Sequence, residues 1–365
     1  MGEDRNLQRI EERVTFALRD LFEAYGYKRF RMSRFERYEL YAGNRDFLQS
    51  DRMITFPDTD GTLLALKPDV TISIIKNAPD RGGVRKICYD EHVYRPPRGS
   101  RSIREIPQAG LECMGEIDGY HVCEVLLLAA KSLALIHPEF VLAVSHLGLL
   151  SGLLAAAGVM PARYGEVLEL LRHKNTAALG ELLTGMELSP AALSILTGAF
   201  STLREGLAAL MPICPEGAGR QALAELDKVE QVLSAAGYGS RVRLDFSVGN
   251  DMDYYNGIVF RGFVDGVPTG VLSGGRYDLL MYKMGKQGGA LGFAVYLDEL
   301  AALDHTEYSV DAEVLLLYGL KDDPAAVLAA VDALTANGAR VLAQREAPEG
   351  MNFSRVIRYS EGDVR

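Results

Sequence analysis

The run NDMDYYNGIVFRGFVDGVPTGVLSGGRYD, residues 250–278, carries the clearest architectural signal in the chain. Tyr254 and Tyr255 precede an Asn-Gly turn, and two short apolar runs follow with Asp265-Gly266 between them. An Asp-Gly pair between two apolar runs is a typical hairpin signal. The glycine-rich segment 274–278 is interpreted as a loop. The run therefore predicts an antiparallel hairpin that could form the floor of a small-molecule pocket.

Further hairpins and helices are expected along the chain. Apolar residues at helical spacing between Leu7 and Tyr25 predict an amphipathic first helix. Residues 53–66, MITFPDTDGTLLAL, have the pattern of a hairpin, and Asp69 or Thr71 can cap a helix that follows. Strands and helices do not alternate regularly, so we predict an α+β fold with an antiparallel sheet flanked by helices rather than a parallel Rossmann sheet.

The composition divides the chain into a core and a small C-terminal unit. Residues 1–305 are expected to form the core. Within it, residues of about 147–240 are rich in Ala, Leu and Glu at helical spacing and are interpreted as a helical insertion. Residues 306–365 have the pattern of a β-α-β unit, which is too short to bury a full domain core.

Charge and composition limit the classes of function. The chain has 365 residues, and 49 acidic against 39 basic side chains give a net charge of −10, which argues against broad nucleic-acid binding. The four cysteines lack metal-ligand spacing and are interpreted as reduced thiols of a cytoplasmic protein. No run of 18 apolar residues stands out, so no membrane span is expected.

Four arginines mark the loop between two strands expected within residues 84–116. Arg95, Arg98, Arg101 and Arg104 recur at a spacing of three around a Pro-Pro turn. Guanidinium groups bind anions in a bidentate manner, so these arginines could converge on an anionic ligand. A solvated basic flap explains the same residues equally well.

Gln108 and Glu112 form a second cluster of candidate residues. Positions i and i+4 of a strand face the same side, and the neighbours of these two are apolar, which favours a shared pocket over a surface face. The chain contains no G-x-G-x-x-G, H-E-x-x-H or G-x-S-x-G motif. No catalytic residue, metal site or cofactor is therefore assigned.

Five segments in order resemble the class II aminoacyl-tRNA synthetases, and the histidyl-tRNA synthetase family most closely. They are LALKPDVT (64–71), YRPPRGSRSIREIPQAGLECMG (94–115), MDYYNGIVF (252–260), LSGGRYDLL (272–280) and GALGFAVYLDEL (289–300). The resemblance spans residues of about 5–303 and implies a class II synthetase-like core, with the helical insertion at the family's place.

The resemblance also implies a pocket for a histidine-like ligand. Its residues would be Asp69, Thr71, Arg95, Gln108, Glu112, Tyr254 and Tyr255. Glu112 and Tyr255 would contact the imidazole, and a carboxylate with a phenol suits imidazole nitrogens. Gln108 and Asp69 would hold the α-amino group. The carboxylate of the ligand would require Arg95 or a residue of a partner.

Two positions depart from the family in a way that concerns ATP. Asn250 stands where the family has an arginine before the Asp-Tyr-Tyr run, and Glu299 stands where the third motif has an arginine against the nucleotide. Amino-acid activation needs fixed cations at the α-phosphate. A like-charge pair at about 4 Å costs about 4 kcal/mol at an effective dielectric constant of about 20. ATP is therefore expected to bind poorly.

A synthetase-like pocket without these arginines, followed by a shortened C-terminal unit, resembles the regulatory subunits of ATP phosphoribosyltransferase. The resemblance implies a non-catalytic protein that assembles with the short catalytic subunit. It also implies a role in the first step of histidine biosynthesis, with histidine as the effector, and a homodimer within a larger hetero-oligomer. A divergent active histidyl-tRNA synthetase is the first alternative, and a stand-alone amino-acid ligase or tRNA-binding relative is the second.

Overall fold

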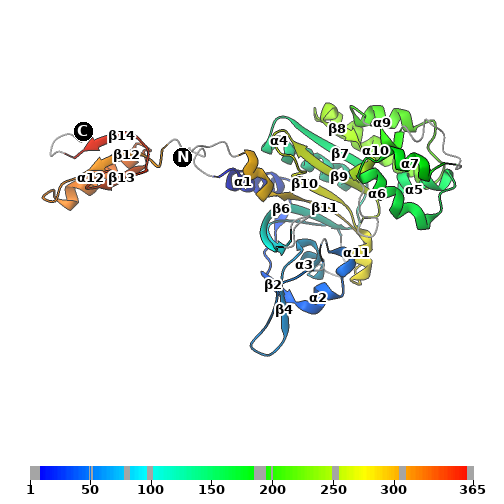
Figure 1. Cartoon of the computed structure of the whole chain (residues 1–365), viewed down its shortest axis with the longest axis horizontal. Helices are drawn as coiled ribbons and strands as arrows, with labels where there is room; N and C mark the ends of the chain where they lie inside the picture. Colours follow the sequence, from blue (N-terminus) through cyan, green and yellow to red (C-terminus); the bar gives the residue numbers. More distant parts are fainter. Residues whose placement is uncertain are drawn as a thin grey trace. The chain divides into compact units, whose positions relative to one another are not determined.

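The computed structural model describes residues 9–48, 50, 52–77, 83–96, 102–184, 195–198, 200–248, 255–303 and 310–359 (Figure 1). These residues fall into two compact units, 9–303 and 310–359. Each unit has a sheet of its own, and the candidate site lies within the first.

The first unit is organised around an eight-stranded sheet in the order β1-β5-β6-β11-β10-β9-β7-β8. The strands are β1 Lys28–Arg29, β5 Arg85–Arg95, β6 Arg104–Gly115, β7 Phe140–His146, β8 Val242–Leu244, β9 Ile258–Val264, β10 Leu272–Arg276 and β11 Gly289–Tyr296. The six inner strands pair antiparallel, as predicted. The two edge strands pair parallel with their neighbours, which the sequence did not indicate.

The parallel edges have a topological reason. Parallel neighbours need a long crossover connection, because a tight turn can only join antiparallel strands. The helical insertion supplies that crossover between β7 and β8, and the connection between β1 and β5 contains α3 and a small second sheet. The sheet is therefore mixed rather than purely antiparallel.

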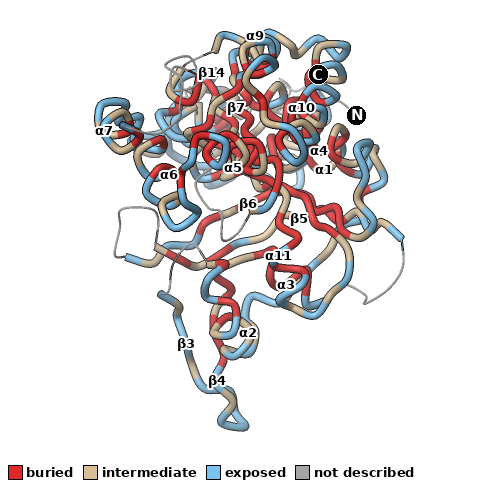
Figure 2. The backbone as a smooth tube through the Cα atoms, turned by 90° about the vertical axis from the view of Figure 1, so that its right-hand side faces the viewer, coloured by how far each residue is buried: buried red, intermediate tan, exposed pale blue. Residues whose placement is uncertain are grey.

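Helices cover both faces of the large sheet. α1 Ile10–Ala24 and α4 Gly119–Ile136 pack on one face, and α2 Tyr38–Ala42, α3 Val70–Lys76 and α11 Asp278–Lys283 belong to a second core cluster on the other. β5 alternates between the two, since Cys88 enters the first cluster whereas Ile87 and Tyr89 enter the second. Figure 2 shows that buried residues are concentrated along the sheet and these helices.

α4 is long and apolar enough to cross a membrane by length and composition. Its packing explains that composition, because Val125, Leu126 and Leu128 are fully buried between the sheet and the helical insertion. Asp118 caps its first turn by accepting a hydrogen bond from the His121 N–H at 3.2 Å. We therefore interpret α4 as the central core helix of this unit.

The predicted hairpin at residues 53–66 belongs to a second sheet. Its strands are β2 Phe35–Arg37, β3 Thr55–Pro57 and β4 Leu63–Leu66, in the order β2-β4-β3. Gly61 has a φ of +85°, which a glycine adopts without strain, and the Asp58 N–H donates to the Thr62 carbonyl at 2.8 Å. The tip of this hairpin is exposed (Figure 2).

The helical insertion is present as predicted. Its helices are α5 Leu147–Ala156, α6 Tyr164–Arg172, α7 Thr176–Leu182, α9 Leu203–Leu210 and α10 Ala218–Ala235. They gather beside β7 and β8 (Figure 1), and their apolar faces extend the main core cluster. Short 3-10 turns are Arg45–Phe47, Pro161–Arg163, Gly239–Arg241, Phe246–Val248 and Leu297–Leu303.

The prediction of a loop at residues 274–278 is wrong. Gly274 and Gly275 lie inside β10, between β9 and β11, and Asp278 begins α11. A Cβ atom at Gly274 would lie 2.5 Å from the Phe293 Cβ and 2.7 Å from the Phe260 ring. The glycine pair therefore permits close packing inside the sheet instead of a turn.

The C-terminal unit contains the predicted β-α-β elements and one further strand. It consists of β12 Ala312–Leu317, α12 Pro324–Ala336, β13 Val341–Gln344 and β14 Phe353–Arg358, with sheet order β13-β12-β14 and parallel pairing throughout. β14 was not predicted, because its Ser and Arg residues interrupt the apolar pattern. Leu316, Val327 and Ala330 form the small core of the C-terminal unit.

Candidate functional site

A cavity of about 290 Å³ opens over the centre of the large sheet. That volume is close to the lower end of the usual range for small-molecule sites, which is roughly 300–1,000 Å³. Six of the seven predicted pocket residues line it, namely Asp69, Thr71, Arg95, Gln108, Glu112 and Tyr255. The seventh, Tyr254, lies outside the described residues, and so does Asn250.

Strand register brings small residues under the centre of the cavity. Glu112 of β6 stands opposite Gly292 of β11, and Gly292 stands opposite Gly275 of β10. A Cβ atom at Gly292 would overlap Oε2 of Glu112. The carboxyl group of Glu112 therefore lies flat over the neighbouring strand, at a place that any other residue would fill.

Glu112 is held by two hydroxyl groups. Thr71 Oγ1 donates to Oε1 at 2.8 Å, and the hydroxyl of Tyr277 donates to Oε2. Burial raises the pKa of Glu112 to about 8, although both hydrogen bonds oppose the shift. Near neutral pH this group is therefore largely a neutral acid, which can donate a hydrogen bond as well as accept one.

Asp69 and Gln108 lie along the wall of the same cavity. Asp69 caps α3 by accepting the Ile72 N–H at 3.0 Å, and burial raises the pKa of Asp69 while that cap and the charge of Arg95 lower it. Gln108 is 4% exposed, and its Nε2 has no hydrogen-bond partner among the described residues. A buried amide without a partner is costly, so a ligand that accepts from it is stabilised.

Arg95 is the one member of the predicted arginine cluster at the cavity among the described residues. It is 5% exposed, and its Nη1 donates to the Pro68 carbonyl at 3.3 Å. Arg104 stands opposite Arg95 in the β5–β6 register but is exposed to solvent. Arg98 and Arg101 lie outside the described residues.

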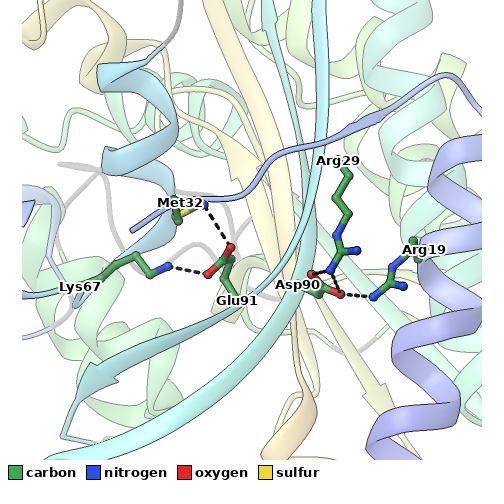
Figure 3. Close-up of polar contacts among 6 residues, drawn as sticks. All are labelled: Arg19, Arg29, Met32, Lys67, Asp90 and Glu91. Atoms are coloured by element: carbon green, nitrogen blue, oxygen red, sulfur yellow. Dashed lines mark hydrogen bonds and ion pairs between the residues drawn. The ribbon is translucent and has the colours of Figure 1, made fainter. Parts of the chain in front are cut away.

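The wall strand β5 is anchored on its cavity side by a buried ion pair. Lys67 is fully buried, and its Nζ lies 2.9 Å from Glu91 Oε2. The other oxygen of Glu91 accepts the Met32 N–H at 3.2 Å (Figure 3). Glu91 stands directly opposite Gln108 in the sheet, so this anchor lies beside the cavity.

Asp90 anchors the opposite face of the same strand. It pairs with Arg19 of α1 and with Arg29 of β1, and its Oδ1 lies 2.6 Å from Arg29 Nη2. Figure 3 shows Asp90 and Glu91 on the two sides of the strand, as expected for consecutive residues. Both faces of β5 are thus held by charge-assisted hydrogen bonds.

One rim of the cavity, just after the end of β11, is acidic. Asp298 and Glu299 both line it, and Glu299 accepts a hydrogen bond from Thr269 Oγ1 at 2.5 Å. Partial burial, and then the charge of Glu299, raise the pKa of Asp298. Among the described residues, no group of three or more His, Cys, Asp or Glu side chains could hold a metal ion.

Sequence comparison identifies the family of the chain. A sequence model of the histidyl-tRNA synthetase family matches residues 4–300. An ATP phosphoribosyltransferase regulatory subunit from Alkaliphilus metalliredigens is 30% identical over 296 residues, which cover 77% of this chain and 73% of the relative. The chain belongs to the histidyl-tRNA synthetase-like family, among the ATP phosphoribosyltransferase regulatory subunits.

Solved structures of this family share the fold. An ATP phosphoribosyltransferase regulatory subunit/histidyl-tRNA synthetase from Bacillus halodurans has a TM-score of 0.80 at 24% identity, covering 96% of this chain and 93% of that one. A chain of the ATP phosphoribosyl transferase complex from Thermotoga maritima has a TM-score of 0.63 at 18% identity, covering 80% and 98%. At these identities the likeness shows the fold alone.

Several residues of this regulatory subunit line the cavity without having been predicted. They are Tyr89, Arg261, Thr269, Tyr277 and Tyr296, among others. Tyr277 lies inside the LSGGRYDLL segment, so the family resemblance held a signal for it that the loop interpretation obscured. Arg261 had no such signal, because a single charged residue in an apolar strand is usually solvated.

Proposed function

We propose that this chain, a regulatory subunit of ATP phosphoribosyltransferase, binds histidine in the cavity around Glu112 and acts by assembling with the short catalytic subunit. The observation that carries the proposal is the buried position of Glu112 between the hydroxyls of Thr71 and Tyr277, in the lining of a cavity of suitable size. The assembly would belong to the first step of histidine biosynthesis.

The chemistry of the cavity fits the two ends of histidine. A neutral imidazole has one N–H donor and one nitrogen acceptor, and a carboxyl group with a pKa of about 8 can serve either. Tyr255 lines the same cavity and lies beside Gly275, which is in the register row of Glu112. The α-ammonium group suits Asp69 and the amide oxygen of Gln108, which lie along the wall.

The acidic rim supports a role without amino-acid activation. By the family resemblance, Glu299 stands where an arginine would lie against the nucleotide, and Asp298 and Glu299 both line the cavity. Amino-acid activation requires fixed cations beside the phosphates of ATP, and a carboxylate at that place repels these phosphates. We therefore propose that the chain has no synthetase activity, and a divergent active histidyl-tRNA synthetase remains the competing function that the test below addresses.

Feedback follows if histidine prefers one state of the assembly. A coupling free energy of about 1–3 kcal/mol between histidine and the catalytic subunit is enough for a regulatory response. The complex from Thermotoga maritima, whose fold this chain shares, supports a catalytic partner. We propose a homodimer within a larger cytoplasmic hetero-oligomer, without a nucleic-acid partner.

Co-purification with the short catalytic subunit, followed by phosphoribosyltransferase assays with and without this chain, tests the assembly. Histidine is then titrated into the isolated chain and into the complex. We expect activity to require this chain and histidine affinity to differ between the two states. Equal affinity in both states removes the coupling, and histidine-stimulated ATP–pyrophosphate exchange by the chain alone would establish the synthetase instead.

Glu112→Gln is the informative variant, and Glu105→Gln is its matched control. Glu112 is buried in the cavity, whereas Glu105 lies on the same strand but is exposed. The first change is expected to weaken histidine binding and the feedback response together. The second is expected to leave both unchanged.

A further inference from the structure

We propose that Arg261 binds the carboxylate of the amino-acid ligand, so that the cavity selects a zwitterion over an amine that lacks the carboxylate. This inference rests on the proposed function, because it takes a histidine-like ligand in the cavity as given. Arg261 would supply the positive charge for the ligand carboxylate, which the sequence assigned to Arg95 or to a residue of a partner.

The register of the sheet places Arg261 one row away from Glu112. Arg261 of β9 stands opposite Ser273 of β10, which stands opposite Ala294 of β11. The neighbouring row, two residues along, holds Glu112 of β6, Gly292 of β11 and Gly275 of β10. Glu112 and Arg261 are thus offset by two residues, about 7 Å, along the strands and by three strand spacings, about 14 Å, across them. The carboxyl group of Glu112 covers part of that span by lying over Gly292.

Small side chains separate the two long ones. Gly292, Ala294 and Ser273 line the cavity between the strands that carry Glu112 and Arg261. Residues on one face of a sheet point the same way, so both long side chains rise from a shallow floor into one space. A ligand lying on this floor meets a carboxyl group at one end and a guanidinium at the other.

The neighbours of Arg261 fix where its guanidinium lies. Its Cζ is 5.6 Å from the centre of the Phe263 ring, a cation–π distance. A Cβ atom at Gly270 would overlap Nε of Arg261. Gly270 also lines the cavity, so the absence of a side chain there leaves room for the guanidinium. Gly270 and Phe263 lie farther along the strands than Arg261, away from the row of Glu112 and level with that of Gln108.

Arg95 is less suited to the same task. Its guanidinium donates to the Pro68 carbonyl, and its positive charge partly offsets the rise that burial causes in the pKa of both Asp69 and Asp298. Arg95 thus compensates two acids of the protein itself. Arg261 presents a planar fork of several donors, which can serve a ligand carboxylate together with another acceptor. Across the same rim, Glu299 is satisfied in part by the Thr269 hydroxyl.

Calorimetric titration of the full chain with L-histidine and with histamine, which lacks only the carboxylate, tests the inference. Arg261→Gln is expected to weaken histidine binding roughly 10- to 100-fold, the value of a hydrogen bond to a charged group. Histamine affinity is expected to change by less than about twofold, and Arg261→Lys to fall between. Arg243→Gln, an exposed arginine of β8, is the matched control and is expected to bind both ligands as the wild type does.

Gly270→Ala gives a second route that keeps the guanidinium. The added methyl displaces Nε of Arg261, so this variant is expected to lower the preference for histidine over histamine in the same direction. If the melting temperature shows that Arg261→Gln does not fold, Gly270→Ala and Arg261→Lys test the inference in its place.

The outcomes separate the two proposals. A wild-type chain that binds neither histidine nor histamine overturns the proposed function, and the inference with it. Histidine binding that Glu112→Gln weakens, combined with an unchanged histidine-to-histamine ratio in the Arg261 and Gly270 variants, overturns the inference alone. A ratio that falls in these variants supports it.

Discussion

The hydroxyl of Thr71 donates a hydrogen bond to Oε1 of Glu112 across 2.8 Å, which joins the first turn of α3 to the centre of β6. Thr71 is in turn placed by the Asp69 cap two residues earlier. A local capping signal thus reaches a buried titratable group of the cavity. The same link couples the start of α3 to the pocket.

Glu112→Gln is expected to change how stability depends on pH. The pKa of Glu112 is about 8 in the folded chain and 4.5 for the free group, so its contribution is fully present below about pH 4.5 and is lost as the pH rises through 8. At pH 8 the cost in the wild type is a few kcal/mol. The amide carries no such cost, and urea unfolding from pH 5 to 8 measures the difference.

The matched control for this experiment is Glu116→Gln, an exposed position just beyond β6. Its pH profile is expected to run parallel to that of the wild type. A Glu112→Gln profile that also stays parallel would show that burial does not perturb Glu112.

Asp69→Asn is expected to separate helix capping from ligand binding. Asparagine caps a helix about as well as aspartate, so the free energy of unfolding should change by less than about 0.5 kcal/mol. Asp69→Ala removes the acceptor for the Ile72 N–H and should cost about 1 kcal/mol. Both variants lose the charge opposite an α-ammonium group, so both should weaken histidine binding at least about tenfold. Full affinity in the asparagine variant would place the ammonium elsewhere.

Lys67→Met is expected to destabilise the first unit by about 3 kcal/mol, because Glu91 keeps its charge in a largely buried place without its partner. Desolvation already lowers the pKa of Lys67, and the hydrogen bond to Glu91 opposes that shift. The double variant Lys67→Met with Glu91→Gln should recover much of the loss, since a glutamine still accepts the Met32 N–H.

A double-mutant cycle in chemical denaturation measures this coupling. Lys283→Met, which breaks the exposed pair with Asp46, serves as the comparison and should leave stability little changed. Additive effects at Lys67 and Glu91 would mean that the ion pair does not anchor β5.

Glu299→Arg is expected to increase affinity for ATP at least about tenfold, because it replaces a carboxylate at the rim with a cation. Glu299→Gln should give a smaller increase, as it removes one charge without adding the other. Titration with ATP, in chains whose histidine binding is intact, provides the readout. Unchanged ATP affinity in both variants would show that the acidic rim is not what excludes the nucleotide.

Local elements of the fold could be predicted from the residues alone. The first helix, the β3–β4 hairpin, the capped start of α3 and the β12–α12–β13 unit depend on contacts between near neighbours. Helical spacing, a turn glycine and a capping carboxylate are sequence patterns that predict such local contacts directly. The common facing of Gln108 and Glu112 follows from the period of a strand for the same reason.

Other features required the order and register of strands that are distant in the chain. The glycines of β10 were misread as a loop, because the aromatic rings that make them necessary belong to β9 and β11. Tyr277 reaches Glu112 across 165 positions of sequence, and no local pattern records that hydrogen bond. The parallel edges of the sheet likewise depend on which strands the crossovers bring together.

The sequence thus indicated which side chains face a common cavity. Only the tertiary structure determined their burial, their neighbours and their pKa values. Identity and spacing marked Gln108 and Glu112 as candidates, and the family resemblance added Asp69. The raised pKa of Glu112 and the place of Arg261 beside a floor of small residues arise only once β11 lies between β6 and β10. Desolvation and register depend on residues that are close in space but distant in the chain, so local sequence patterns do not predict them.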